Sequence, residues 1–263
     1  MSEHHPTYPN AVEALLLIAL LMAIELFVAA AVFDANVLAG VNDGDVYGFI
    51  TVVGNGILFV GLMAYKRLNY RALFHPAGHS VVATMTLVSV PILMVVPGLV
   101  IGAGAANTLV QWLFPMDADD LARFEEQMAP GIVPVLFSCV AAPVLEEMLF
   151  RGVILRAFLQ RYPRGIAIAH SAGVFGLAHM NLYQFVVGLT LGLVTGWLYE
   201  RTRSLWPCIA LHAAYNSSLT WLALNTPAGA DAGPGLGGAG LALAAALLSA
   251  LWLKRCLQPA TAR

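Results

Sequence analysis

The sequence predicts an all-α polytopic membrane protein, a bundle of about eight transmembrane helices. Hydrophobic residues make up 59% of the 263 residues and charged residues only 11%, whereas a soluble domain carries about a quarter charged residues. The apolar residues gather in runs that approach the roughly 20 residues a helix needs to cross a bilayer. The charged loops between these runs alternate in sign. Together these observations exclude an ordinary soluble fold.

Eight apolar runs are the expected helices, the first of them retained rather than cleaved as a signal peptide. They cover residues 11–33, 46–65, 80–102, 131–151, 166–181, 183–200, 204–223 and 236–254. We expect the third to continue to Leu113 and the fourth to pass beyond the membrane toward Leu159. The fifth and sixth are short and meet at residues 180–183. They form either a tight helical hairpin or a pair of partly buried helices.

The loops between the runs differ in charge on the two sides of the predicted bundle. Basic residues follow the second, fourth, sixth and eighth runs, and of the 13 basic residues only Arg123 falls in an acidic loop. Lys and Arg concentrate in cytoplasmic loops, so this pattern predicts that both termini are cytoplasmic. An odd number of spans would break the alternation. We therefore expect a multi-pass protein of the inner (plasma) membrane.

No linker divides the chain, so residues 1–263 are expected to form a single integral membrane domain. Residues 116–129 are acidic and carry apolar residues three to five apart, which predicts an amphipathic helix on the outer membrane surface. The chain contains no basic run of the kind that binds nucleic acid, so nucleic acid is not expected as a partner. Residues 188, 192 and 196 are glycines on one face of the sixth run, which allows close approach of a neighbouring helix.

Ionisable and amide side chains inside the apolar runs mark the candidate site. Charged residues at membrane depth cost roughly 2.5–3.5 kcal/mol each on insertion scales, so they usually serve a function. The candidates are Glu146, Glu147, Arg151, His179, His212 and Asn216. Glu147 and Arg151 are four residues apart and can pair on one helix face, whereas Glu146 is rotated by about 100° and can face another helix. His212 and Asn216 share one stripe of the seventh run.

Together these side chains are the parts that peptide hydrolysis requires, although each alone could serve only to pair helices. A carboxylate beside an imidazole can hold a water molecule and take its proton. A second imidazole with an amide can donate hydrogen bonds to the oxyanion formed at an attacked carbonyl. A zinc interpretation stays open, because Glu146, His179 and His212 would make a His₂Glu set with a position for water. The His-Glu-x-x-His pattern of helical zinc sites is absent.

The order of the motifs resembles the CAAX prenyl protease and bacteriocin-processing family (CPBP, or Abi). Glu-Glu-x-x-x-Arg at 146–151, Phe-x-x-x-His at 175–179 and His-x-x-x-Asn at 212–216 carry the resemblance. It covers residues 130–223, the expected protease core.

The resemblance implies roles for the candidate residues. Glu146 and His179 would activate the nucleophilic water, and His212 with Asn216 would form the oxyanion hole. Glu147 and Arg151 would be a supporting ion pair. Eukaryotic-type relatives look like glutamate-dependent enzymes without a bound metal, so no cofactor is expected to be required, with zinc as the alternative.

The expected function is therefore that of an intramembrane endopeptidase, a hydrolase that cuts a peptide or protein substrate near the membrane. Several prokaryotic members of the family that the chain resembles are linked to bacteriocin maturation or self-immunity. Two alternatives stay open. A proton-coupled transporter would use the buried glutamate and histidines as a relay, although no discontinuous-helix or inverted-repeat signal is present. A non-catalytic immunity protein would retain the site without using it.

Two further expectations concern geometry. Glu25, near the middle of the first run, is expected to pair with a polar neighbour such as Asn55 of the second. In the predicted layout Glu146 lies about five residues from the inner end of its helix, and His179 about thirteen residues into the next. At 1.5 Å per residue this places them more than about 10 Å apart along the bundle axis. Such an offset indicates that a helix boundary is misplaced.

Overall fold

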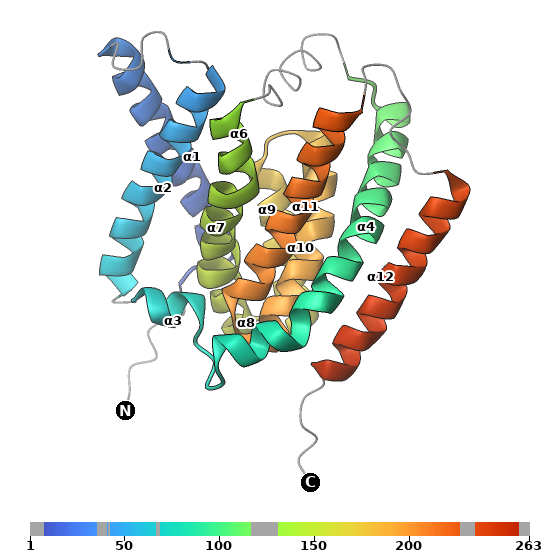
Figure 1. Cartoon of the computed structure of the whole chain (residues 1–263). Coiled ribbons are helices and arrows are strands. Elements are labelled where there is room, and N and C mark those ends of the chain that lie inside the picture. The colour runs from blue at the N-terminus through green and yellow to red at the C-terminus, as the bar shows by residue number, and fades with distance from the viewer. Residues whose placement is uncertain are drawn as a thin grey trace.

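The computed structural model describes residues 8–35, 41, 43–66, 69–116, 131–226 and 235–257. These residues form helices and no strand, and Figure 1 shows the long helices side by side, running alternately up and down. The amphipathic helix expected at 116–129 falls outside the described residues except for Met116. Eight helical segments lie where the sequence predicts them: α1 (Ala11–Asp34), α2 (Asp43–Lys66), α4 (Val81–Leu113), the segment Ile132–Arg161, α9 (Arg164–Ala178), α10 (Leu182–Thr202), α11 (Leu205–Asn225) and α12 (Leu236–Cys256).

Six of these eight segments are long and apolar enough to cross a membrane, and the exceptions are α9 and α11. With 15 residues, α9 is about 22 Å long, shorter than the roughly 30 Å hydrocarbon core. Helix α11 has 21 residues but carries histidine, asparagine and serine in its middle. The protein is thus a multi-pass membrane protein in which the two histidine-bearing helices are the least membrane-like.

The fourth segment is one long helix that changes its hydrogen-bonding pattern twice. It consists of α6 (Ile132–Leu136), η1 (Phe137–Ala141), α7 (Ala142–Glu147), η2 (Met148–Leu155) and α8 (Arg156–Arg161), of which η1 and η2 are π-helical. Pro143 has no N–H, and its ring clashes with the carbonyl four residues earlier. The regular α-helical hydrogen bond to the carbonyl of residue 139 is therefore lost. The Ala142 N–H instead bonds to Phe137 O, five residues back.

The length of this segment removes the offset between Glu146 and His179. The helix ends at Arg161, fifteen residues after Glu146, and α9 begins at Arg164, fifteen residues before His179. The apolar run ends at residue 151, but the helix continues past it into its basic end, as expected, and stops two residues beyond the expected Leu159. Counted from these helix ends, the two residues lie at a similar height in the bundle.

Helices α9 and α10 form the tight hairpin that was one of two expectations for them. Met180 takes a left-handed conformation with φ 52°, and the Asn181 side chain accepts hydrogen bonds from the backbone N–H groups of Tyr183 and Gln184. The glycines of α10 face α9: a Cβ atom at Gly192 would lie 2.9 Å from Ala172 Cα. The close approach holds His179 at the turn, between the two helices.

Helices α1 and α2 form a second hairpin on one side of the bundle (Figure 1). Asn55, 4% exposed, donates a hydrogen bond to Glu25 across the pair at 3.2 Å, which confirms the expected pairing. The hairpin has a small apolar cluster of its own, formed by Val28, Val46 and Ile50. The main core joins residues of this hairpin and of α4 to the fourth segment, α9, α10 and α11.

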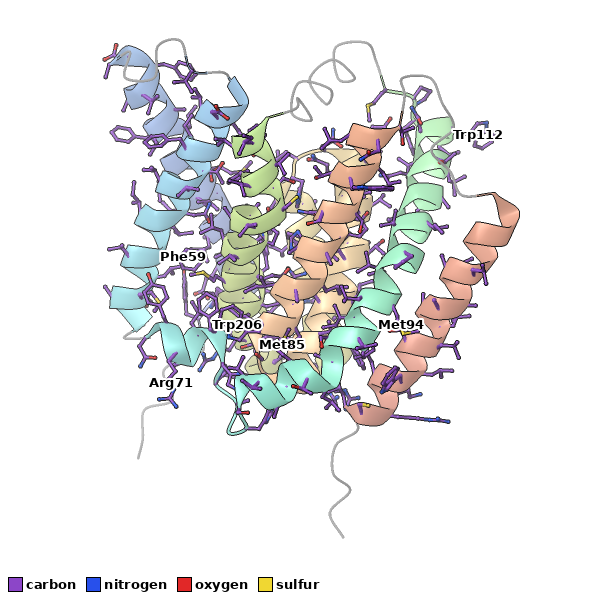
Figure 2. The ribbon with its side chains drawn as sticks, in the orientation of Figure 1. Phe59, Arg71, Met85, Met94, Trp112 and Trp206 are labelled. Carbon is purple, nitrogen blue, oxygen red and sulfur yellow. The ribbon has the colours of Figure 1, made fainter. Side chains whose placement is uncertain are left out.

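Polar and aromatic side chains mark the two ends of the bundle. The short helix α3 (Tyr70–Phe74), α8 and the last turn of α12 share the lower end in Figure 1, and Arg71 lies there in Figure 2. Arg156 of α8 ties this end together by donating to Ala72 O at 2.7 Å. Trp112 and Trp206, at opposite ends, are 77% and 41% exposed (Figure 2). Exposed tryptophans at both ends are typical of the two membrane interfaces.

Candidate active site

Glu147 and Arg151 form the ion pair that their spacing predicts, in the centre of the bundle. Arg151 Nη1 lies 3.0 Å from Glu147 Oε1, and both side chains are 0% exposed. The guanidinium also lies over the ring of Phe175, with Cζ 4.5 Å from the ring centroid. Two charges removed from water in this way are stable only as a pair. The pair therefore fixes the π-helical part of the fourth segment against α9.

His212 of α11 lies between the two glutamates. Its Nδ1 is 2.9 Å from Glu147 Oε1, and its Nε2 is 3.7 Å from Glu146 Oε2. The His212 side chain is 4% exposed, whereas that of Glu146 is 30% exposed. Glu147 thus orients the buried imidazole from behind, and Glu146 meets it from the open side of the cluster.

Some buried polar atoms of the cluster have no hydrogen-bond partner. They are Glu147 Oε2 and the Nε and Nη2 atoms of Arg151. Buried polar groups are nearly always paired with protein or with water, so unpaired ones call for an explanation. A site that receives water and a peptide group is one place where such atoms find partners.

Phe175 connects the two histidines. Its ring packs edge-on against His179, with centroids 5.1 Å apart, and against His212, with centroids 5.8 Å apart. His179 Nδ1 lies 2.9 Å from Phe175 O, one turn earlier in the same helix. If Nδ1 donates to that carbonyl, Nε2 of the neutral ring is left as an acceptor. His179 is half-buried, as Glu146 is, so solvent or substrate can reach both side chains.

Asn216, one turn beyond His212 on α11, contacts the first π-helical turn. Its Nδ2 donates to Ser138 O at 2.9 Å. The amide carries two N–H donors, so this bond leaves one of them for another acceptor. Ser138 was not among the residues singled out in the sequence. The proline at position 143 was the only signal of an irregular turn beside it.

The contacts differ in one respect from the arrangement that the family resemblance implies. Within the described structure, the Glu146 carboxylate contacts His212, the histidine expected in the oxyanion hole, and makes no hydrogen bond or ion pair with His179. Helix rotation decides which imidazole a carboxylate meets, and motif spacing does not report rotation between separate helices. Glu146, Glu147, Arg151 and His212 meet directly. His179 joins them through Phe175 and Asn216 through Ser138.

The zinc interpretation requires Glu146, His179 and His212 to converge on one point. Among the described residues, no three His, Cys, Asp or Glu side chains do so. Both nitrogens of His212 face carboxylates, and His179 Nδ1 faces a backbone carbonyl. The side chains as arranged do not fit a zinc ion, and we derive no step through one.

A third carboxylate approaches the site from the α1–α2 hairpin. Glu25 is close enough to Glu146 for the two side chains to repel each other electrostatically. Gly54 of α2 permits this position, because a Cβ atom there would lie 2.5 Å from Glu25 Cγ. The N-terminal hairpin therefore contributes to the electrostatics of a cluster that the later helices build.

Comparison with known proteins identifies the same part of the chain. Residues 128–218 match the family described as type II CAAX prenyl endopeptidase Rce1-like. The "Putative membrane peptidase YdiL" of Bacillus subtilis (strain 168) is 28% identical over 91 residues, which are 35% of this chain and 37% of the relative. The chain thus aligns with little more than a third of that relative's length. No solved structure matches this chain.

The matched segment holds every candidate residue, from Glu146 to Asn216. It begins before the first π-helical turn and ends within α11, so it contains all the helices that meet at the Glu147–His212 contact. This segment of the chain thus resembles the CAAX prenyl endopeptidase family, in agreement with the resemblance that its motifs carry.

Proposed function

We propose that the protein is an intramembrane endopeptidase that hydrolyses a peptide bond with water activated by glutamate and histidine. The observation that carries this proposal is the position of His212, held by a fully buried glutamate and facing a second, partly open one. Peptidases need a base that water can reach and a fixed donor for the oxyanion. Glu146 and His212 fit those two roles.

The proposed reaction begins with a water molecule beside Glu146. The carboxylate takes one proton as the water oxygen attacks the peptide carbonyl carbon, and the carbonyl oxygen becomes an oxyanion. Protonation removes the charge that held Glu146 to His212. The Nε2–H of His212, supported at Nδ1 by Glu147, is then free to donate to the oxyanion. As the C–N bond breaks, Glu146 returns its proton to the leaving nitrogen, which yields a carboxylic acid and an amine.

His179 and Asn216 have supporting roles in this proposal. His179 Nε2, oriented by the bond from Nδ1 to Phe175 O, accepts a hydrogen bond from the attacking water and directs its lone pair. The second N–H of Asn216 donates to the oxyanion beside His212. Two donors on one face of α11 would hold the oxyanion more rigidly than one, because they need no rearrangement as charge develops.

The substrate is proposed to be a peptide or protein with a cleavage site close to the membrane. The open side of the cluster lies among helices that span the bilayer, so a membrane-tethered chain reaches it more readily than a soluble one. We place the basic end of the bundle and both termini on the cytoplasmic side of the plasma membrane. The resemblance to the CAAX protease and bacteriocin-processing family favours peptide processing or self-immunity to a bacteriocin as the biological role.

The test is Glu146→Gln, which keeps the size of the side chain and removes the base. General-base catalysis contributes roughly 10²–10⁴-fold, so we expect cleavage to fall by at least about 100-fold. The readout is the set of membrane peptides that accumulate uncut in cells with the variant compared with the wild type. Asp34→Asn, an exposed carboxylate at the end of α1, is the matched control. Full activity of Glu146→Gln would reject the mechanism. It would leave a proton-coupled transporter or a non-catalytic immunity protein as the better hypotheses.

A further inference from the structure

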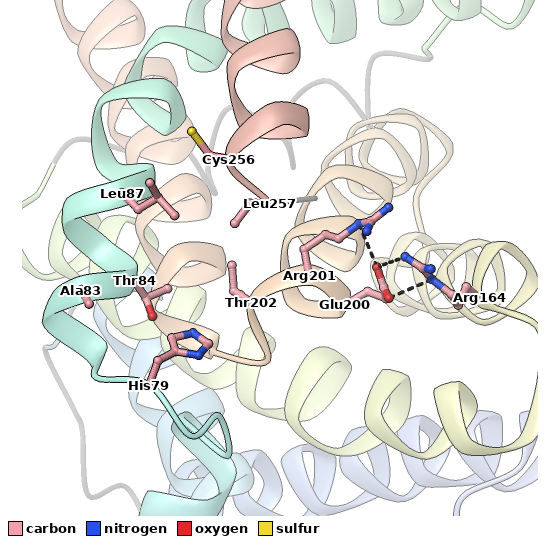
Figure 3. A pocket seen from close by; sticks show the side chains of 10 residues that line it. All are labelled: His79, Ala83, Thr84, Leu87, Arg164, Glu200, Arg201, Thr202, Cys256 and Leu257. Carbon is pink, nitrogen blue, oxygen red and sulfur yellow. Dashed lines mark hydrogen bonds and ion pairs between the residues drawn. The ribbon is translucent and has the colours of Figure 1, made fainter. Parts of the chain in front are cut away.

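A cavity of about 550 Å³ opens at the basic end of the bundle, away from the glutamate–histidine cluster (Figure 3). It lies where α4 begins and where α10 and α12 end, and the start of α9 closes one side. Its volume falls within the roughly 300–1,000 Å³ of small-molecule sites. None of the proposed catalytic residues lines it.

One wall of the cavity carries an excess of positive charge. Arg164 binds Glu200 with two nitrogens, Nε and Nη2, each 2.8 Å from a carboxylate oxygen. Arg201 Nε lies 3.3 Å from the same carboxylate, yet this buried nitrogen makes no hydrogen bond because its N–H is poorly aligned. Figure 3 shows the two guanidinium groups on either side of the single carboxylate. Two arginines thus share one negative charge, and an N–H donor is left over.

The opposite wall is mixed, and its apolar part continues along the outside of α4. Ala83 and Leu87 of α4 and Leu257 after α12 line the cavity beside the polar His79 and Thr84. Leu87, Val90 and Leu93 are 44%, 54% and 62% exposed, and their spacing of three places them on one helix face. An exposed apolar strip therefore runs from the cavity toward the middle of a membrane-spanning helix.

We propose that this cavity binds the headgroup of an anionic phospholipid. The phosphate accepts hydrogen bonds from Arg201 and Arg164, which are charge-assisted and strong. The glycerol lies against Leu257 and Ala83, and the first methylene groups of one acyl chain follow Leu87 and Val90. Basic residues near the ends of α10 and α12, Arg203, Lys254 and Arg255, raise the positive potential around it. A free phosphate would use the arginines but not the apolar strip.

The test uses the purified full chain in a neutral detergent. The probes are dioleoyl phosphatidylglycerol, dioleoyl phosphatidylcholine and inorganic phosphate. Native mass spectrometry measures the bound lipid, and a thermal melt measures stabilisation. We expect phosphatidylglycerol to be retained and to raise the melting temperature, and the other two probes to do neither. One basic residue near a membrane surface contributes about 1 kcal/mol, so Arg201→Gln is expected to weaken phosphatidylglycerol binding by about five-fold.

Two further variants keep this test decisive. Arg255→Gln removes the same charge at the same end but does not line the cavity, so it loses only a contribution to the potential and should weaken lipid binding less than Arg201→Gln does. Ala83→Trp fills the exposed side of the cavity without changing charge and is expected to prevent binding even if Arg201→Gln fails to fold. Equal losses in Arg201→Gln and Arg255→Gln, or unchanged binding in Ala83→Trp, would overturn the proposal. Equal stabilisation by inorganic phosphate would reject a lipid in favour of a free anion.

Discussion

Helices α1 and α11 have nearly the same length but opposite relations to the membrane. The most apolar window of α1 has a mean hydropathy of 2.8, and its large side chains point outward: Leu16 is 63% exposed and Phe27 75%. Helix α11 is too polar to count as a span, yet it buries Leu211, His212 and Tyr215 against other helices. High hydropathy therefore marks the helices that face lipid. The polar helix is tolerated because its neighbours shield it from lipid, and it carries the candidate chemistry.

Arg151→Met should be the most damaging single change, because it leaves Glu147 charged and buried at the centre of the shielded region. Breaking a buried pair from one side costs about 3–5 kcal/mol, and we expect a loss of that size in the free energy of unfolding in detergent. Adding Glu147→Gln removes the second charge and keeps an acceptor for His212. The double variant should regain more than half of the loss. A double variant as unstable as Arg151→Met would show that the pair is not what stabilises the core.

The comparison can be measured with one substitution made on both helices. Leu211→Ala on α11 removes a side chain that is 0% exposed and leaves a cavity, which costs about 3 kcal/mol in the free energy of unfolding. Leu16→Ala on α1 removes a side chain that faces lipid, an environment as apolar as the protein interior, and should cost much less. The same denaturant titration in bilayer-like bicelles measures both. Similar losses would mean that α1 packs against protein rather than against lipid.

Features that depend on local sequence were predictable. Apolar runs and loop charges predicted all eight helical segments and the Glu25–Asn55 pair, because each depends on local composition or on one helix face. The α9–α10 hairpin was one of two arrangements that the sequence left open. Spacing within one helix predicted the Glu147–Arg151 pair for the same reason.

The contacts that join different helices at the candidate site could not be predicted from the sequence in the same way. Whether Glu146 meets His179 or His212 depends on how three helices rotate about their axes, and one residue of shift turns a side chain by about 100°. The π-helical turns change that rotation within a single segment. Pro143 is the only sequence feature that indicates the first π-helical turn, and no residue of Met148–Leu155 indicates the second. Hydropathy falls before the fourth segment stops, so the apolar run alone ends at residue 151, although the expected continuation toward Leu159 comes within two residues of the actual end at Arg161.

Asn216→Ala separates a catalytic role on α11 from a structural one. Loss of one oxyanion donor lowers kcat by roughly 10²–10³-fold, and we expect about 100-fold with little change in KM. A purely structural role, through the bond to Ser138 O, would instead lower the melting temperature and leave the activity of the folded fraction intact. Paired activity and melting measurements on Asn216→Ala and on Asn225→Ala distinguish the two. Asn225 donates only within its own helix turn and is the control.

The smallest expected effect concerns the α9–α10 hairpin, which holds His179 at its turn. Gly192→Ala places a Cβ atom 2.9 Å from Ala172 Cα, so α9 and α10 must move apart, at a cost of about 1 kcal/mol or more. Gly173→Ala, on α9 itself, adds the same methyl group where nothing lies within 4 Å and should stabilise the helix by about 0.5–1 kcal/mol. Thermal melts of the two variants should therefore shift in opposite directions. Because His179 caps α9, the separation also shifts this histidine relative to His212 on α11, and Gly192→Ala should reduce cleavage by more than its loss of stability explains. If both variants melt and cleave alike, the close approach of the two helices does not position the histidine.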